Sequence, residues 1–415
     1  MPAHTARLAL LLGIAGSAVC PSGNIAADDG ETYELDYLIE LVPEDGIAEV
    51  RVVLGEDAEL VREIRFHIEP QRHRGFSGDG EIDVDGEYVR WLPPEDGGSI
   101  EFEADIDHER GTGSYDALMT DEWALFRGDD VVPPARVRTA AGAESDARLK
   151  LTAPDGWSVV TPYPGLDDGW VRVEHSDRRF DRPTGWMTAG NLGVRRERIR
   201  GVEVAVAGPV GHGIRRMDIL AFLNWNLPEL LRVFDDFHEV FLVVSAGDPM
   251  WRGGLSGPAS IFLHADRPLI SENGTSTLMH ELMHAALRAG AEPGDDWIVE
   301  GLAEFYALEL MRRSGTISED RYERAYEQLS EWSEDADDLD AGRSKGAITA
   351  RAVLVMRGLD EEIRDETDGD ESLDDVVREI AESEQPVDLE RLREIAEEVA
   401  GDTVEALTAD ELPGI

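Results

Sequence analysis

The chain has 415 residues, of which 42% are hydrophobic and 7% aromatic, a composition ordinary for a globular protein with a sizeable core. Its charge is unusual, because 88 acidic residues against 39 basic ones give a formal net charge of −49. Such a charge repels nucleic acids and anionic membrane surfaces, so both are poor partners and no nucleic-acid partner is expected. The acidic residues are spread along the chain, which favours a solvated surface suited to high salt. The alternative is a field that steers basic substrates.

The first 27 residues have the features of a secretory signal peptide. Arg7 supplies a positive charge, residues 8–19 form an apolar run, and Ile25-Ala26-Ala27 supplies small residues for cleavage. The run is too short to cross a bilayer, and no other run is long and apolar enough to do so. Cys20 is the only cysteine, so it is removed with the signal or, alternatively, carries a lipid anchor. We therefore expect an exported protein, periplasmic or extracellular, without a transmembrane span.

Residues 28–207 have the pattern of a β domain. Alternating apolar and polar residues at 33–42 and 48–54, separated by the turn Pro43-Glu44-Asp45-Gly46, predict a β-hairpin. Regular short strands with Gly- and Asp-rich turns favour a β-sandwich-like domain. Further strands are predicted at 64–68, 88–92, 100–104, 147–152 and 201–207.

Residues 208–415 are predicted to form a second, mainly helical domain, which makes the chain an α+β multidomain protein. A helix at 214–234 contains Pro228, which is expected to kink or divide it. Two apolar runs at 240–245 and 259–264 predict buried strands. Helices are then predicted around 278–288 and at 297–313, 319–332, 344–367, 372–383 and 388–400.

Residues 280–284 carry the motif His-Glu-x-x-His on the first of these helices. Residues four apart lie on one helix face, so the imidazoles of His280 and His284 point toward the same spot. Zinc prefers neutral imidazole nitrogens, a third protein ligand and one open position. Glu281 lies beside His280, where a general base must be to take a proton from the attacking water. The alternative is an exposed helix face that matches the motif by chance.

Two glutamates on the next predicted helix are candidates for the remaining roles. Glu300 and Glu304 are four residues apart and share one face, and Gly301 between them allows close approach of another backbone. Glu300 is the candidate third ligand, although a carboxylate in so acidic a chain is more often solvated. Glu304 is the candidate partner for the second nitrogen of His280, because a zinc-bound histidine usually donates to a carboxylate. The alternative is a solvated helix glutamate.

Five segments follow one another in an order that resembles the glycyl aminopeptidase family, the sixty-first family of metallopeptidases, which belongs to the gluzincins. They are Gly253-Gly254-Leu255, 280–284, Trp297-Ile298-Val299-Glu300-Gly301, Lys345-Gly346-Ala347 and 363–379. The resemblance covers roughly residues 205–410. It implies a thermolysin-like catalytic domain after an N-terminal β domain, and one zinc ion held by His280, His284 and Glu300 with Glu281 as the base. The C-terminal PDZ domain usual in that family is missing from the sequence.

The sequence departs from the family pattern at two positions. The family usually has a glutamate after the segment equivalent to Gly253, Gly254 and Leu255, and related aminopeptidases use it to bind the free α-amine of the substrate. Here that position is Ser256. The relatives also place a tyrosine two positions before the Lys-Gly-Ala segment to stabilise the oxyanion. Here that position is Arg343, which either donates to the oxyanion in its place or lies on the surface.

The sequence therefore predicts an exported zinc metallopeptidase that hydrolyses peptide bonds in a peptide or protein substrate. The extended substrate is expected to pair with the edge formed by Gly253, Gly254 and Leu255. Two alternatives remain open: a binding module of peptidase ancestry that cleaves weakly or not at all, and a zinc hydrolase of a non-peptide amide or ester. Endo- versus aminopeptidase action, side-chain preference and oligomeric state are not predicted.

Overall fold

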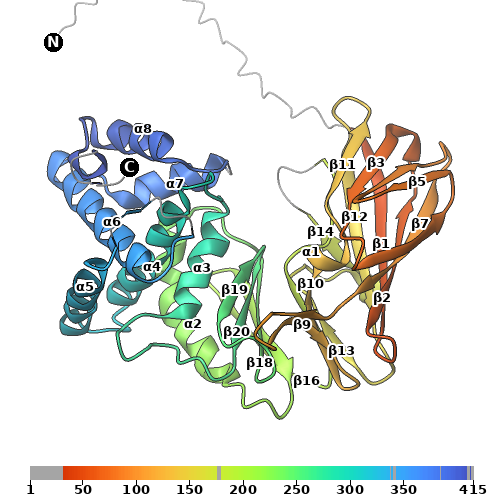
Figure 1. Cartoon of the computed structure of the whole chain (residues 1–415), viewed down its shortest axis with the longest axis horizontal. Coiled ribbons are helices and arrows are strands. Elements are labelled where there is room, and N and C mark those ends of the chain that lie inside the picture. The colour runs from red at the N-terminus through yellow and green to blue at the C-terminus, as the bar shows by residue number, and fades with distance from the viewer. Residues whose placement is uncertain are drawn as a thin grey trace, which may run out of the picture.

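The computed structural model describes residues 31–174, 179–336, 338–339, 343–383, 385–408 and 412. The predicted signal peptide and Cys20 lie outside the described residues. Figure 1 shows a β-rich part, coloured red to yellow, beside a part whose helices are coloured green to blue. Within the described ranges, no helix has the length and apolar character needed to cross a membrane.

Two sheets of the N-terminal part pack face to face over a shared apolar core. The strand β1 shows why, because Tyr33, Leu35, Tyr37, Ile39 and Leu41 alternate with polar residues and are all buried. The expected hairpin is present as the antiparallel pair β1–β2. The six-stranded sheet has the order β14 (Val171–Val173), β12 (Glu144–Thr152), β1 (Thr32–Val42), β2 (Ile47–Leu54), β7 (Gly98–Asp105) and β4 (His73–Gly78). The four-stranded sheet has the order β11 (Ala135–Thr139), β3 (Val61–His67), β6 (Tyr88–Leu92) and β5 (Glu81–Asp85).

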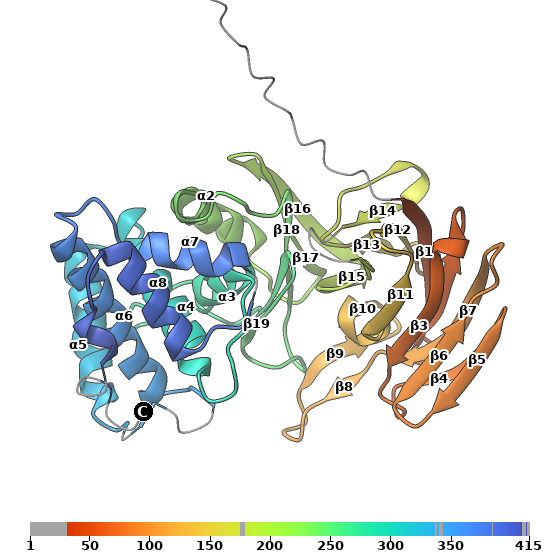
Figure 2. The ribbon, with the colours of Figure 1, turned by 90° about the horizontal axis from the view of Figure 1, so that it is seen from above.

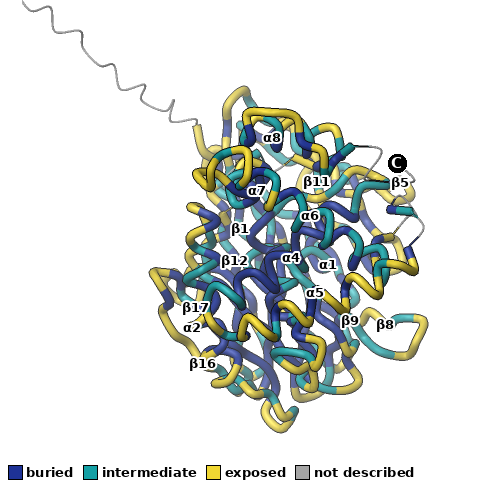
Figure 3. Tube along the Cα trace, turned by 90° about the vertical axis from the view of Figure 1, so that its left-hand side faces the viewer, coloured by how far each residue is buried: buried dark blue, intermediate teal, exposed yellow. Residues whose placement is uncertain are grey.

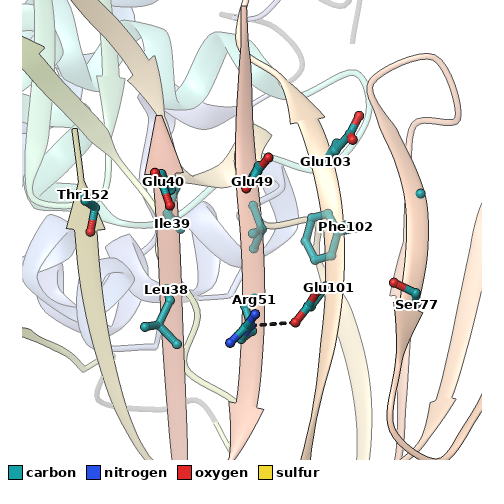
Figure 4. Close-up of a pocket in the computed structure, with 12 residues that line it drawn as sticks. Leu38, Ile39, Glu40, Glu49, Arg51, Ser77, Glu101, Phe102, Glu103 and Thr152 are labelled. Atoms are coloured by element: carbon teal, nitrogen blue, oxygen red, sulfur yellow. Dashed lines mark ion pairs between the residues drawn. The ribbon is translucent and has the colours of Figure 1, made fainter. Parts of the chain in front are cut away.

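A hollow of about 450 Å³ lies on the outer face of the six-stranded sheet. Figure 4 shows its wall, where Glu40, Glu49 and Glu103 stand on neighbouring strands and Arg51 pairs with Glu101. None of the predicted site residues lines it. It is a solvated acidic surface of the kind that the net charge of −49 implies.

A third and a fourth sheet connect the N-terminal part to the helices. The third has the order β13 (Ser158–Val160), β15 (Trp186–Gly190), β10 (Trp123–Arg127), β9 (Tyr115–Met119) and β8 (His108–Glu109), with α1 (Gly128–Val131) after β10. The fourth has the order β16 (Leu192–Ile199), β17 (Val202–Pro209), β18 (Val240–Ala246), β20 (Ser260–His264) and β19 (Gly254–Gly257). The strands β17, β18 and β20 are parallel, and β19 forms an antiparallel edge.

The fourth sheet is buried on both faces. Along β17, Val204 and Val206 point into the core formed with the helices, whereas Ala205 and Ala207 point into a core formed with the third sheet. The predicted domain boundary after residue 207 falls inside β17. Because β17 pairs with β18, the sheet that supports the helices begins before that boundary.

The helices cover the face of the fourth sheet that lies opposite the third sheet (Figure 2). Their bounds agree with the predicted ones to within a few residues, and α2 continues through Pro228. Figure 3 shows α4 buried among them. They are α2 (Arg216–Val233), α3 (Thr277–Leu287), α4 (Asp296–Arg313), α5 (Glu319–Ser333), α6 (Ala347–Glu366), α7 (Leu373–Ser383) and α8 (Leu389–Ala400). Short 3₁₀ turns lie at Ala58–Leu60, Asp167–Gly169 and Glu405–Leu407.

Candidate metal centre

The helix α3 has two histidines on one partly exposed face, because its other faces are buried in the core. It begins at Thr277, and the N-cap residue Ser276 precedes it, with a hydroxyl that accepts a hydrogen bond from the backbone N–H of Met279 at 3.3 Å. Leu278 and Leu282 are fully buried against the sheet and the other helices. The side chains of His280 and His284 lie on the remaining face and keep 16% and 17% of their surface exposed.

The helix α4 is fixed in rotation by packing on almost every side. Apolar side chains such as Trp297, Leu302 and Leu308 are fully buried. Gly301 lies directly against Ala352 of α6, where an added Cβ would approach the Ala352 Cβ to 2.8 Å, so the predicted close approach at Gly301 is confirmed. The Asp296 carboxylate accepts a hydrogen bond of 2.6 Å from the backbone N–H of Ser344, which ties the start of α4 to the segment before α6.

Three ligand atoms from these two helices converge. His280 Nε2 lies 3.3 Å from Glu300 Oε2, and His284 Nε2 lies 3.4 Å from Glu300 Oε1. The two imidazole Nε2 atoms are 3.1 Å apart. All three ligand atoms lie within 4.8 Å of one another, and this is the one such group of His, Cys, Asp and Glu side chains among the described residues. Two imidazoles and one carboxylate with a partly exposed face are the donor set that catalytic zinc sites use.

The second nitrogen of His280 is engaged by Glu304. His280 Nδ1 lies 3.0 Å from Glu304 Oε2, which comes from the next turn of α4 after Glu300. When Nδ1 carries the proton and donates to this carboxylate, the lone pair of Nε2 is left facing Glu300 and His284. Glu304 therefore fixes both the ring orientation and the tautomer that a metal ligand needs.

The electrostatics of the cluster favour a positive charge at its centre. Burial opposes protonation of His280, but hydrogen bonds to Glu300 and Glu304 outweigh it and raise the pKa of His280 well above its ordinary value. Burial likewise opposes ionisation of Glu300, yet hydrogen bonds to His280 and His284 lower its pKa well below the ordinary range. Both shifts express the same preference for a cation between these side chains, so the residues fit a divalent metal ion.

Glu281 lies against the edge strand β19. An added Cβ on Gly254 would lie 2.6 Å from Thr277 Cγ2 and 2.9 Å from Glu281 Cγ. A larger residue at 254 would therefore displace Glu281 or the strand, which is the physical reason for glycine at this position. The predicted edge and the predicted base are thus in direct van der Waals proximity.

The edge strand has free backbone groups where it passes Glu281. The N–H of His264 donates to the carbonyl of Gly253 at 3.0 Å, so residues 253 and 264 form a hydrogen-bonded pair of the antiparallel ladder. Such pairs alternate with non-hydrogen-bonded ones, so Gly254 and Ser256 direct their backbone N–H and C=O groups away from β20. Because β19 is the last strand of its sheet, these groups face the open edge.

A residue that the sequence analysis missed holds this edge in place. The indole Nε1 of Trp186, on β15 of the third sheet, donates to the carbonyl of Leu255 at 2.9 Å. Trp186 is fully buried, and its ring packs at a tilt against that of Phe262 on β20, with the ring centroids 5.4 Å apart. Nothing in the sequence indicates this contact, because the two residues are 69 positions apart and belong to different predicted domains.

Ser256 and Arg343, the two residues that depart from the family pattern, lie on β19 and before α6. Ser256 is half-buried on β19, and because side chains alternate along a strand it shares the face of Gly254, toward α3. Arg343 is exposed in the bend before α6. Its neighbour Ser344 contacts Asp296 at the start of α4, so Arg343 lies near that helix end rather than in the core.

No family model and no curated protein matches the chain. Among solved structures it is similar to an aminopeptidase N family protein from Idiomarina loihiensis, with a TM-score of 0.62 and 15% identity over 92% of this chain and 74% of that one. It is also similar to an M1 zinc metallopeptidase from Deinococcus radiodurans, with a TM-score of 0.56 and 14% identity over 92% of this chain and 94% of that one. The structure of a point mutant of that enzyme has a TM-score of 0.57 and 14% identity over 91% of this chain and 92% of that one. The chain shares their fold.

Proposed function

We propose that the chain is a zinc-dependent metallopeptidase that hydrolyses peptide bonds. The observation that carries the proposal is the convergence of His280, His284 and Glu300, whose ligand atoms lie within 4.8 Å of one another on two packed helices. The fold that the chain shares with an aminopeptidase N family protein and with structures described as an M1 zinc metallopeptidase supports the same conclusion. The proposal includes a relationship to the glycyl aminopeptidase family. It rests on the order of the motifs at residues 253–255, 280–284, 297–301 and 345–347.

His280, His284 and Glu300 would hold one zinc ion, which supplies a Lewis acid that activates water and polarises a carbonyl group. Glu304 keeps the His280 ring oriented through its contact with Nδ1 at 3.0 Å. Glu281 follows His280 on α3 and lies against Gly254, which supports its role as the base that would take a proton from the attacking water and return it to the leaving amine.

An extended peptide is the substrate that the edge of β19 fits. The outward N–H and C=O groups of Gly254 and Ser256 offer the main-chain hydrogen bonds by which a peptide adds as a further strand. The proximity of Glu281 to Gly254 supports a base that acts beside such a strand. With serine at 256 in place of a carboxylate, this part of the edge carries no charge that selects a free α-amine. We therefore favour cleavage within a peptide over removal of its first residue.

Export through a signal peptide at residues 1–27 is part of the proposal and rests on the sequence pattern alone. The role of Arg343 as an oxyanion donor remains a prediction. Its exposed position in the bend before α6 is the observation that favours the rival function, a peptide-binding module that retains the metal but cleaves weakly.

The variant Glu281→Gln tests the proposal directly. It should bind zinc as the wild type does, measured by metal analysis after dialysis, and should lose hydrolysis in a peptide-library digest read by mass spectrometry. The matched control is Glu272→Gln, an exposed glutamate before α3, which should leave both properties unchanged. Equal hydrolysis by the wild type and Glu281→Gln would refute the role of Glu281. Wild-type protein loaded with zinc but inert on the library would favour the binding module.

A further inference from the structure

The β8–β9 hairpin of the third sheet contacts the segment that leads into the edge strand. The N–H of Tyr115 donates to the carbonyl of Pro249 at 3.1 Å, and the N–H of Trp251 donates to the carbonyl of Tyr115 at 2.8 Å. Tyr115 and Met250 accordingly form a parallel β-bridge. Figure 1 shows the hairpin extending from the β-rich part toward β19 and β20. A part of the chain far from the metal ligands in sequence therefore borders the proposed substrate edge.

The contact ends in an arginine that is stacked on an aromatic ring. The Arg110 guanidinium lies over the Trp251 ring, with its Cζ 4.0 Å from the ring centroid. Its Nε donates to Asp116 Oδ1 at 2.5 Å, so stacking and hydrogen bonding together fix its plane. The Trp251 ring in turn covers Gly253, where an added Cβ would come within 2.2 Å of a ring atom. Arg110 and Gly253 thus both lie against the Trp251 ring, just before β19 begins.

We propose that Arg110 is a specificity-determining residue that binds a carboxylate of the peptide substrate beside the Gly253 end of β19. The inference rests on the proposed function, because it assumes that a peptide lies along this edge. Among the described residues, the side-chain hydrogen bond of Arg110 is the one from Nε to Asp116, so the two terminal nitrogens keep donors for a further partner. Nearly a third of the Arg110 side chain, 31%, is exposed to solvent. A stacked, pre-oriented guanidinium is the group best suited to bind a carboxylate through two parallel hydrogen bonds.

The strand geometry defines which substrate groups meet Arg110. Gly254 faces Glu281 and α3, so its neighbours Gly253 and Leu255 face the opposite side of the sheet, where the third sheet packs. Side chains of an added strand alternate in the same way. Those directed away from α3 lie on the side of Trp251 and Arg110. The carboxylate belongs to an aspartate or glutamate at such a position or to the C-terminus of a short peptide.

The test uses matched peptides that differ by one charge. Each pair carries Glu or Gln at one position near the cleaved bond, and each peptide is made with a C-terminal acid and with a C-terminal amide. For the pair that differs in the carboxylate bound by Arg110, the wild type should cleave the charged peptide with a kcat/KM about tenfold higher than the uncharged one. This ratio corresponds to roughly 1.4 kcal/mol. The Glu/Gln arm and the acid/amide arm distinguish the two sources of that carboxylate.

Arg110→Gln should abolish most of this preference through a higher KM for the charged peptide with kcat retained. Arg110→Lys should keep a smaller preference, since it retains the charge but not the planar stacked fork. The matched control is Arg252→Gln, because Arg252 adjoins Trp251 but is exposed and pairs with Asp248. It should keep the wild-type preference. No preference in the wild type, or the same preference in Arg110→Gln, would overturn the proposal.

A binding measurement separates this inference from the proposed function. Glu281→Gln protein and the double variant with Arg110→Gln are titrated with the fluorescein-labelled peptide pairs, and anisotropy reports binding. If the double variant binds the charged peptide more weakly than Glu281→Gln does, the Arg110 site is supported even when the wild type hydrolyses no peptide. Equal binding of both peptides by both proteins overturns the site even where hydrolysis is confirmed.

Discussion

Gly301→Ala tests whether helix packing sets the position of Glu300. The new Cβ would approach Ala352 Cβ to 2.8 Å and the Ala352 carbonyl oxygen to 3.2 Å, whereas ordinary carbon–carbon contacts are about 3.5–4.0 Å. The helices α4 and α6 must therefore separate by about 0.7 Å or more at this point. Overpacking of this kind typically costs about 1–3 kcal/mol, and alanine regains about 1 kcal/mol of helix propensity relative to glycine. The net expectation is a loss of up to about 2 kcal/mol.

The matched control is Gly358→Ala in the interior of α6, where no atom of the described residues lies within 4 Å of an added Cβ. It should gain about 1 kcal/mol from helix propensity alone. Urea unfolding measures the change in the free energy of unfolding for each variant, and the difference between the two changes is the packing cost. A competition titration with a chelator measures zinc affinity. Gly301→Ala should lose zinc affinity because the adjacent Glu300 moves with α4. If both glycine variants were stabilised equally and bound zinc alike, the packing argument would be wrong.

Two further predictions concern the other carboxylates of α4. Glu304→Gln should weaken zinc binding by about 10–100-fold at unchanged fold, as measured by chelator competition, because the amide supports the His280 ring less strongly than the carboxylate does. Glu309 is buried, which opposes its ionisation, but hydrogen bonds from Arg312 and Arg313 lower its pKa. Its stabilising effect is therefore complete above the ordinary glutamate pKa of about 4.3 and is lost as pH falls below it. Urea unfolding between pH 3 and 7 should show that the free energy of unfolding of Glu309→Gln falls less steeply with acid and is about 3–5 kcal/mol lower at neutral pH. The same pH dependence of stability in the wild type and the variant would contradict this assignment.

The local features of the site follow directly from the sequence. The four-residue spacing of His280 and His284 places both rings on one helix face, and Ser276 caps that helix through its hydroxyl. The same spacing on α4 predicts that Glu300 and Glu304 share a face, and the structure places both against His280. These inferences depend only on helix geometry, which a short stretch of sequence determines.

Contacts between distant parts of the chain are not contained in such local patterns. The residues of β17 are apolar apart from Glu203, and this composition alone does not indicate that β17 pairs with β18. The hydrogen bond from Trp186 to Leu255 and the stacking of Arg110 on Trp251 join segments more than 60 residues apart. Loop-closure entropy and the packing of several sheets decide these contacts together, so no local sequence signal reports them.

The geometry of the candidate centre depends on the core more than on the ligands themselves. Burial on nearly every face of α4 leaves little freedom to rotate the helix, so Glu300 is aimed at His280 and His284 by packing against neighbours such as Ala352. One turn further along, Glu304 fixes the His280 ring, and beyond it Glu309 and Arg313 tie the same helix to Asp374 of α7. We therefore expect a substitution at either end of α4 to affect the candidate ligands through the helix, because a buried helix of this kind moves as a unit rather than bending locally.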